Sequence, residues 1–136
     1  MGRIAITLGI VLGTLAMGFI LFVYFTPHLS TEYGMRFNKE HFSLIRTNIT
    51  VEEVYRLVGP PLFSQVNPDV SGTGAYRQTR DYDVGLDHLR SLVLRTNTEV
   101  YLEFSAPKHA GRDYFRYSVD FLHGVVRSYA GPVRMD

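Results

Sequence analysis

Histidine is the residue type in this chain whose chemistry is easiest to recognise, because imidazole binds metals and exchanges protons near neutral pH. No two of the five histidines stand at a spacing typical of paired metal ligands; they are His28, His41, His88, His109 and His123. Asp87 and His88 are adjacent, and residues one apart do not face each other on a helix. The histidines therefore predict no metal centre and no catalytic dyad.

Nucleophile and phosphate-binding motifs are missing as well. The chain has no cysteine, which excludes disulfides, thiolate metal sites, a cysteine nucleophile and a lipoprotein-type lipid anchor. No serine stands in a Gly-x-Ser-x-Gly elbow. The Gly-Thr-Gly at 72–74 lacks the preceding strand and the following helix start with lysine that a phosphate loop needs. We therefore expect a protein with no enzymatic activity, no cofactor and no metal.

The charge balance also excludes one class of partner. Lys and Arg total 14, Asp and Glu total 13, and the two signs are interspersed along the chain. Such a balance gives no basic surface for nucleic acid and no polybasic segment for anionic lipid. We expect no nucleic-acid partner.

The amino-terminal region carries a long apolar run, Ile4 to Phe25, without one charged side chain. About 20 apolar residues in a helix cross a bilayer core. A cleaved signal peptide is the alternative, but its apolar part is shorter and ends at a small-x-small site. This run ends instead in Phe22, Tyr24 and Phe25, which resemble an interfacial aromatic belt. We expect residues 1–26 to be an uncleaved transmembrane signal-anchor.

The flanks of this run predict an orientation. Pro27 would end the helix, and residues 27–37 would form a short linker to a single domain at 38–136. Arg3 lies at one end, whereas the first Lys or Arg beyond the other end is Arg36. By the positive-inside rule, the amino terminus is cytoplasmic and the domain lies on the outer side.

Small residues within the run offer a contact surface for a second helix. Gly9 and Gly13 form a G-x-x-x-G pair, and Thr14 with Gly18 repeats the spacing on a neighbouring face. Such residues let two helix backbones approach closely in lipid. The spacing also arises by chance, so a passive tether is the alternative.

A short helix is predicted from Thr50 to Val58. Thr50 and Glu53 form a T-x-x-E capping box, in which each side chain satisfies a backbone N–H at the helix start. Carboxylates at the first turn also suit the positive end of the helix dipole, which explains Glu52. Gly59 allows the left-handed conformation that closes a helix, and two prolines then prevent continuation. A preceding short helix is expected to hold Phe42 and Ile45.

Further along the chain the apolar period becomes two, which is typical of strands. Val100, Leu102 and Phe104 alternate with polar residues, and a second alternating run follows from Phe115 to Phe121. His123-Gly124 then reads as a two-residue hairpin turn. This turn would oppose Phe121 to Val126 and Asp120 to Arg127.

Two segments are less defined. Residues 76–82 are predicted to be an edge strand. Residues 86–98 fit either a short helix or part of a strand pair, and the helix is slightly favoured. The nine tyrosines and nine phenylalanines suit an aromatic ligand platform or, as we favour, the core and flank of a small sheet.

The stretch from Phe42 to Pro61 resembles the opening motif of the SmpA/OmlA (BamE-like) domain family. The matching positions are Phe42, Ile45, Thr50, Glu53, Val54, Leu57, Gly59 and Pro61. The resemblance extends to a final strand pair around a Gly-Val turn, at 119–129. It implies an α+β domain of two short helices on a three-stranded, or four-stranded, antiparallel sheet. It also implies a bacterial, usually periplasmic domain that binds other envelope proteins without catalysis.

The chain departs from this family in two ways. Asn48-Ile49 replaces Gly-Met, although asparagine tolerates left-handed geometry. An apolar helix replaces the lipoprotein cysteine, so an outer-membrane location and a role in barrel assembly cannot be carried over.

These observations leave several functions open. The first is a single-pass inner-membrane protein whose periplasmic domain acts as an envelope assembly or stabilising factor. The alternative is an accessory subunit of a large inner-membrane complex, for example an energy-converting one, held by its helix and its domain. A ligand-binding sensor would require an apolar pocket inside the domain.

Overall fold

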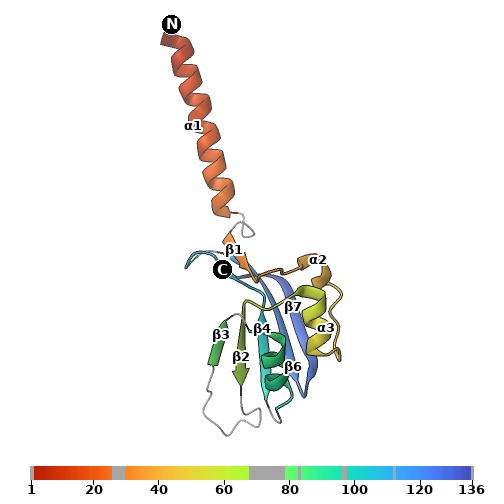
Figure 1. Cartoon of the computed structure of the whole chain (residues 1–136). Helices are drawn as coiled ribbons and strands as arrows, with labels where there is room; N and C mark the ends of the chain where they lie inside the picture. Colours follow the sequence, from red (N-terminus) through yellow and green to blue (C-terminus); the bar gives the residue numbers. More distant parts are fainter. Residues whose placement is uncertain are drawn as a thin grey trace.

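The computed structural model describes residues 2–25, 30–67, 79–82, 84–95, 98–111 and 113–135, and the side chains of these residues except at 2–8 and 79–82. Within them the chain is α+β, as predicted. A long helix projects from a small domain in which short helices pack on an antiparallel sheet (Figure 1).

Helix α1 runs from Gly2 to Phe25. All of its described side chains, from Gly9 onward, are exposed. In the described part of the chain, no helix combines the length and the hydropathy needed to cross a membrane. The expected role of Ile4–Phe25 as a membrane span stays a prediction, and the expected stop at Pro27 lies outside the described residues.

In the described part of the chain the main sheet already has five strands, so the predicted three or four was too few. Their order across the sheet is β3-β2-β4-β6-β7, and all neighbours are antiparallel. The strands are β2 (Phe63–Asn67), β3 (Thr79–Tyr82), β4 (Glu99–Glu103), β6 (Tyr114–Leu122) and β7 (Val125–Met135). Strand β2 escaped prediction because Ser64 occupies a fully buried position, which hides the apolar alternation. Strand β3 confirms an edge strand at 79–82, whereas 76–78 lie outside the described residues.

A second, two-stranded sheet lies between α1 and the main sheet. Strand β1 (Thr31–Tyr33) pairs antiparallel with β5 (Ser105–Pro107), and Tyr33 is opposite Ser105. Strand β1 lies within residues 27–37, the segment that we expected to form the linker.

Helix α3 (Val51–Val58) confirms the strongest local prediction. The N–H of Thr50 donates to Glu53 Oε2 at 3.0 Å, and the N–H of Glu53 donates to Thr50 Oγ1 at 3.4 Å. Gly59 ends the helix with a positive φ of 87°, but its ψ of −171° is not the left-handed helical conformation that its position predicted.

The helix before α3 is shorter than expected. Helix α2 (Lys39–Phe42) begins after the cap residue Asn38, whose side chain accepts two backbone N–H bonds. Phe42 belongs to it, but Ile45 lies beyond its end in a hydrogen-bonded turn and is nevertheless fully buried. The placement of Ile45 inside the helix was therefore wrong, although its burial keeps the motif position in the core.

Helix α4 (Leu86–Val93) answers the question left open at 86–98: a helix comes first, and β4 follows at Glu99. Helices α2, α3 and α4 contribute apolar side chains to one core on a single face of the main sheet. The core also takes in Phe104 and Tyr117, whose rings lie near those of Phe37 and Phe42. These aromatic residues therefore fill the core, as we favoured.

The hairpin of β6 and β7 turns at His123 and Gly124 as predicted. Both residues have positive φ, 53° and 84°, which is typical of a type I′ turn. The predicted pairing of Phe121 with Val126 is confirmed.

One residue further from the turn, the predicted register is wrong. Asp120 is opposite Ser128 rather than Arg127. The register shifts between Asp120 and Phe121, so Arg127 is an extra residue on β7. This β-bulge bends the strand and aims the Arg127 side chain across the sheet.

Candidate functional site

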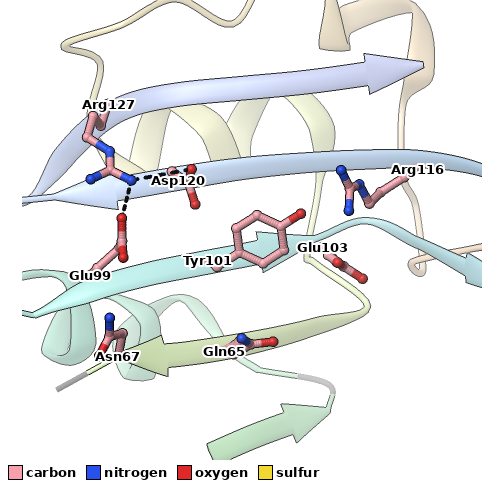
Figure 2. A pocket seen from close by; sticks show the side chains of 8 residues that line it. All are labelled: Gln65, Asn67, Glu99, Tyr101, Glu103, Arg116, Asp120 and Arg127. Atoms are coloured by element: carbon pink, nitrogen blue, oxygen red, sulfur yellow. Dashed lines mark ion pairs between the residues drawn. The ribbon is translucent and has the colours of Figure 1, made fainter. Parts of the chain in front are cut away.

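The face of the main sheet opposite the helices carries an open groove of about 450 Å³ (Figure 2). Core residues such as Val100 and Leu102 point to the helices, so the alternating residues between them point into the groove. Four strands, β2, β4, β6 and β7, contribute to its lining. The lining residues are Gln65, Asn67, Glu99, Tyr101, Glu103, Arg116, Asp120 and Arg127.

One end of the groove holds a compensated charge cluster. Arg127 forms ion pairs with Glu99 on β4 and with Asp120 on β6, the latter at 3.7 Å between Nη2 and Oδ2. Ser128 Oγ donates a hydrogen bond to Asp120 at 2.7 Å. The acids at this end are therefore already engaged by neighbouring strands.

Tyr101 occupies the centre of the groove, between Arg127 on one side and Arg116 on the other (Figure 2). It is opposite Gln65 on β2 and Asp120 on β6. Burial raises the pKa of the Tyr101 hydroxyl, and the carboxylates of Glu103 and Asp120 add to the effect. The phenol therefore stays protonated at neutral pH and acts as a hydrogen-bonding group.

The other end of the groove holds the guanidinium of Arg116, which is only partly buried. Arg116 Nε is buried and has no hydrogen-bond partner in the described part of the chain. A buried donor without a partner loses its hydration without compensation. An arriving carboxylate or carbonyl oxygen would satisfy it, and a guanidinium suits a carboxylate best.

The side chains of this groove offer amide, hydroxyl, guanidinium and carboxylate groups, which can form hydrogen bonds and ion pairs with a polar ligand. Among the described residues, no group of three or more His, Asp or Glu side chains is arranged to hold a metal ion. A polar segment laid across four strands would meet both donors and acceptors.

The family-like motif lies away from this groove. Phe42, Ile45 and Val54 are buried in the core, and Leu57 packs against it. Pro61 is also buried. The motif therefore builds the helical layer that supports the sheet, and contributes none of the groove residues.

Among the described residues, the histidines do not gather with acidic side chains into a metal-binding cluster either. His41 Nδ1 lies 3.2 Å from the carbonyl oxygen of Leu57. Asp87 pairs with Arg90 at 3.2 Å. His109 is exposed in the loop after β5, and His28 lies outside the described residues, as does the Gly-Thr-Gly at 72–74.

On α1 the expected small residues are open to contact. A Cβ atom added at Gly9, Gly13 or Gly18 would meet no atom within 4 Å. A shallow groove on the helix is lined by Gly13, Thr14 and Gly18 together with larger apolar residues, and Gly9 is not part of its lining. Thr14 Oγ1 donates to the carbonyl of Ile10 at 2.9 Å, so this hydroxyl is already satisfied.

Sequence reasoning missed the groove on the sheet. A signal was present in 99–103, where Glu99, Tyr101 and Glu103 occupy every outward position. The register with β2 and β6 that gathers the other lining residues could not be read from local pattern. No family model matches this chain, and no curated protein or solved structure matches it either.

Proposed function

We propose that this chain is a non-catalytic, single-pass protein of a bacterial inner membrane. Helix α1 anchors it, and the domain lies on the periplasmic side. There the groove of the main sheet binds a polar segment of a partner envelope protein, one carboxylate of which meets Arg116, so that the chain serves as an assembly or stabilising factor.

The state of α1 supports the anchor. Its described side chains, from Gly9 to Phe25, are all exposed: Leu15 is 66% exposed, Phe19 68% and Phe25 66%. Soluble monomers rarely expose apolar patches larger than a few hundred Å². In lipid the same side chains would be solvated, and the helix would satisfy its backbone internally.

The length of the apolar run in the sequence also fits this proposal. The uncharged run extends from Ile4 to Phe25, and roughly 20 apolar residues are needed to cross a bilayer core. The side chains that the structure describes, from Gly9 to Phe25, cover only part of this run. Arg3 at the amino-terminal end of this run favours a cytoplasmic location for that end.

The proposal that the groove binds a partner rests on one observation. Arg116 Nε has no hydrogen-bond partner in the described part of the chain, although it lies in a groove lined by polar side chains. A protein that acted only as a tether would gain nothing from a buried Nε donor without a partner. A partner carboxylate would form a charge-assisted hydrogen bond with it. The groove crosses several strands, which gives room for a peptide segment.

The resemblance to the SmpA/OmlA (BamE-like) family favours the same class of function. The reciprocal cap of Thr50 and Glu53, the positive φ of Asn48 (68°) and the final hairpin agree with the family pattern. The five-stranded sheet is wider than the family implies. We keep from the resemblance only the idea of an envelope protein-binding module.

Site-specific photocrosslinking tests the partner-binding proposal. A benzophenone amino acid replaces Gln65 in the groove or, as the control, the exposed Arg56 on α3. We expect a discrete adduct from position 65 and none from position 56. Arg116→Glu should abolish the adduct because it replaces the cation by a repelling charge, whereas Arg95→Glu should leave it unchanged.

Equal adducts from positions 65 and 56 would show that the groove is not the docking site. An adduct from position 65 that survives Arg116→Glu would show that carboxylate recognition by this residue is wrong. Circular dichroism of each variant shows whether the domain is still folded.

The shallow groove on α1 favours a second candidate, an accessory subunit of a larger inner-membrane complex. Gly13, Thr14 and Gly18 give this side of the helix a low profile on which another helix backbone fits. In this case α1 is itself a binding surface, and the domain adds a second contact to the same complex.

A further inference from the structure

We propose that the base of α1 and the loop after β5 form a binding site for the phosphate headgroup of one phospholipid. This inference rests on the proposed anchoring of α1 in a membrane. Lys108 and His109 supply the polar part of the site, and the last turns of α1 supply the apolar part.

The first observation is the way the loop is tied to the helix. The N–H of Lys108 donates to the carbonyl of Ser30 at 2.6 Å. The neighbouring Pro107 pairs with Thr31 in the β1–β5 sheet. Ser30 follows Phe25 by five residues, which span at most about 18 Å when fully extended. If Phe25 lies at the membrane surface, Lys108 cannot lie far from it.

The second observation is a pocket of about 460 Å³ at this junction. One wall is made by Phe19, Ile20 and Val23, which are apolar, and by Tyr24. The remaining lining is Ser30, Lys108 and His109. An apolar wall that leads to a cationic mouth suits an acyl chain joined to a phosphate, and tyrosine is enriched at this depth of a bilayer.

The third observation is the availability of these polar groups. Lys108 and His109 are exposed, and the described part of the chain records no ion pair for either side chain. The aliphatic stem of a lysine can lie along apolar surface while its ammonium reaches a polar layer. The ammonium is therefore free to meet a lipid phosphate.

The placement of Lys108 at the membrane surface, and not a high density of basic residues, would create this site. The chain has no polybasic segment, so general attraction to an anionic surface is weak. Here one cation is placed at the membrane surface by the Ser30 hydrogen bond and by the β1–β5 pairing. The contact would turn the β1–β5 end of the domain toward the membrane, with the hairpin at 123–124 at the far end (Figure 1).

The chain offers an internal control for a chemical test, because its only lysines are Lys39 and Lys108. The full chain is acetylated by a water-soluble amine reagent in detergent micelles and in phosphatidylglycerol bilayers. Peptide mass spectrometry then gives the ratio of modification at the two lysines. We expect this ratio, Lys108 over Lys39, to fall at least threefold in the bilayer.

Two further arms identify the headgroup chemistry. Bilayers of a galactolipid, which has no phosphate, should restore most of the Lys108 reactivity. Inorganic phosphate at 10 mM added to micelles should not protect Lys108, since the apolar wall contributes only when an acyl chain is attached. Protection by inorganic phosphate alone, or equal protection by galactolipid, would overturn the phospholipid site.

A second readout uses the absence of cysteine. Single variants His109→Cys and His123→Cys carry a fluorophore, and quenching by headgroup-nitroxide lipid is compared between them. We expect strong quenching at 109 and at least threefold less at 123. Equal quenching at both positions would contradict the proposal.

The outcome also separates this proposal from the anchoring on which it rests. Alkaline washing of the same bilayers reports whether α1 is inserted. Retention in the washed bilayer with unprotected Lys108 overturns the lipid site and leaves the anchor standing. Release by the wash overturns the anchor and the lipid site together.

Discussion

Arg127 and Asp120 form an ion pair, with 3.7 Å between Nη2 and Oδ2, although they are not partners in the strand register. The β-bulge in β7 makes Arg127 an extra residue, so its side chain reaches over β6 as far as Glu99 on β4. One cation thus connects three neighbouring strands at the edge of the groove. The pairs are partly exposed, so their energetic weight is modest.

We expect Arg127→Ala to lower the free energy of unfolding by about 0.2–1 kcal/mol, the usual range for exposed ion pairs. The loss should be larger at low salt, because Glu99 and Asp120 are left close together without their cation. Urea unfolding of the full chain in mild detergent, at low and high salt, measures it. The exposed Arg95→Ala is the control, and identical losses for both variants would contradict the proposed connection.

Gly59 is expected to be irreplaceable. Its φ of 87° and ψ of −171° lie in a region that only glycine adopts readily, and an added Cβ would come 2.7 Å from the carbonyl oxygen of Arg36. Gly59→Ala should cost about 1–3 kcal/mol of stability.

Gly85 supplies the matched control for Gly59. It is the N-cap of α4, has a φ of −71°, makes no side-chain cap and has open space around it. Gly85→Ser should stabilise the domain by a few tenths of a kcal/mol, because serine adds a capping oxygen. Thermal unfolding of both variants measures the difference. A Gly59→Ala variant that is more stable than the Gly85→Ser variant would contradict both expectations.

The raised pKa of Tyr101 predicts alkaline sensitivity. An unfolded chain releases the phenol proton near pH 10, whereas the folded domain holds it to higher pH because of burial. The unfolded state therefore binds fewer protons above about pH 10, and stability should fall as pH rises through this range.

Tyr101→Phe should reduce this alkaline loss. Burial raises the pKa of Tyr117 as well, so part of the loss should remain in the variant. Urea midpoints measured from about pH 8 to 11 give the two profiles. Parallel profiles for the variant and the natural chain would show that Tyr101 does not contribute.

Local sequence predicted those parts of the fold that depend on near neighbours. The α3 cap, the edge strand at 79–82 and the His123-Gly124 turn were all recognisable, because backbone N–H satisfaction and positive φ involve residues a few positions apart. The buried Ser64 broke the apolar pattern of β2, so one strand was lost and the sheet was predicted too narrow.

The candidate site was less accessible from sequence. The β-bulge at Arg127 is a shift in the register of β6 and β7, and no residue in the local sequence predicted it. The groove exists because Gln65, Tyr101 and Asp120 are opposite one another on three strands that are distant in sequence. Strand register over such separations is fixed by the whole core and not by local propensity.

Substitutions at Gly9 and Gly13 of α1 can distinguish a helix that only anchors the domain from a helix that also binds a partner. Replacing both Gly9 and Gly13 with Leu should leave the domain folded, because none of the described side chains of α1, at 9–25, belongs to the core of the domain. Leucine is more apolar than glycine, so membrane retention should persist.

If a partner helix packs on this face, its co-purification with the double variant should fall several-fold, because the backbones can no longer approach. Leu12→Ala and Leu15→Ala serve as controls on the exposed helix surface. Unchanged recovery of the same partner would mean that α1 acts only as a tether.

The most direct test concerns the anchor. Membranes from cells that produce the natural chain are washed at alkaline pH, and the retained protein is analysed by intact mass. We predict that the protein stays in the washed membrane with the apolar run Ile4–Phe25 still attached to the domain. Recovery in the supernatant, or a mature terminus near residue 26, would contradict the proposal that α1 holds this domain at a membrane.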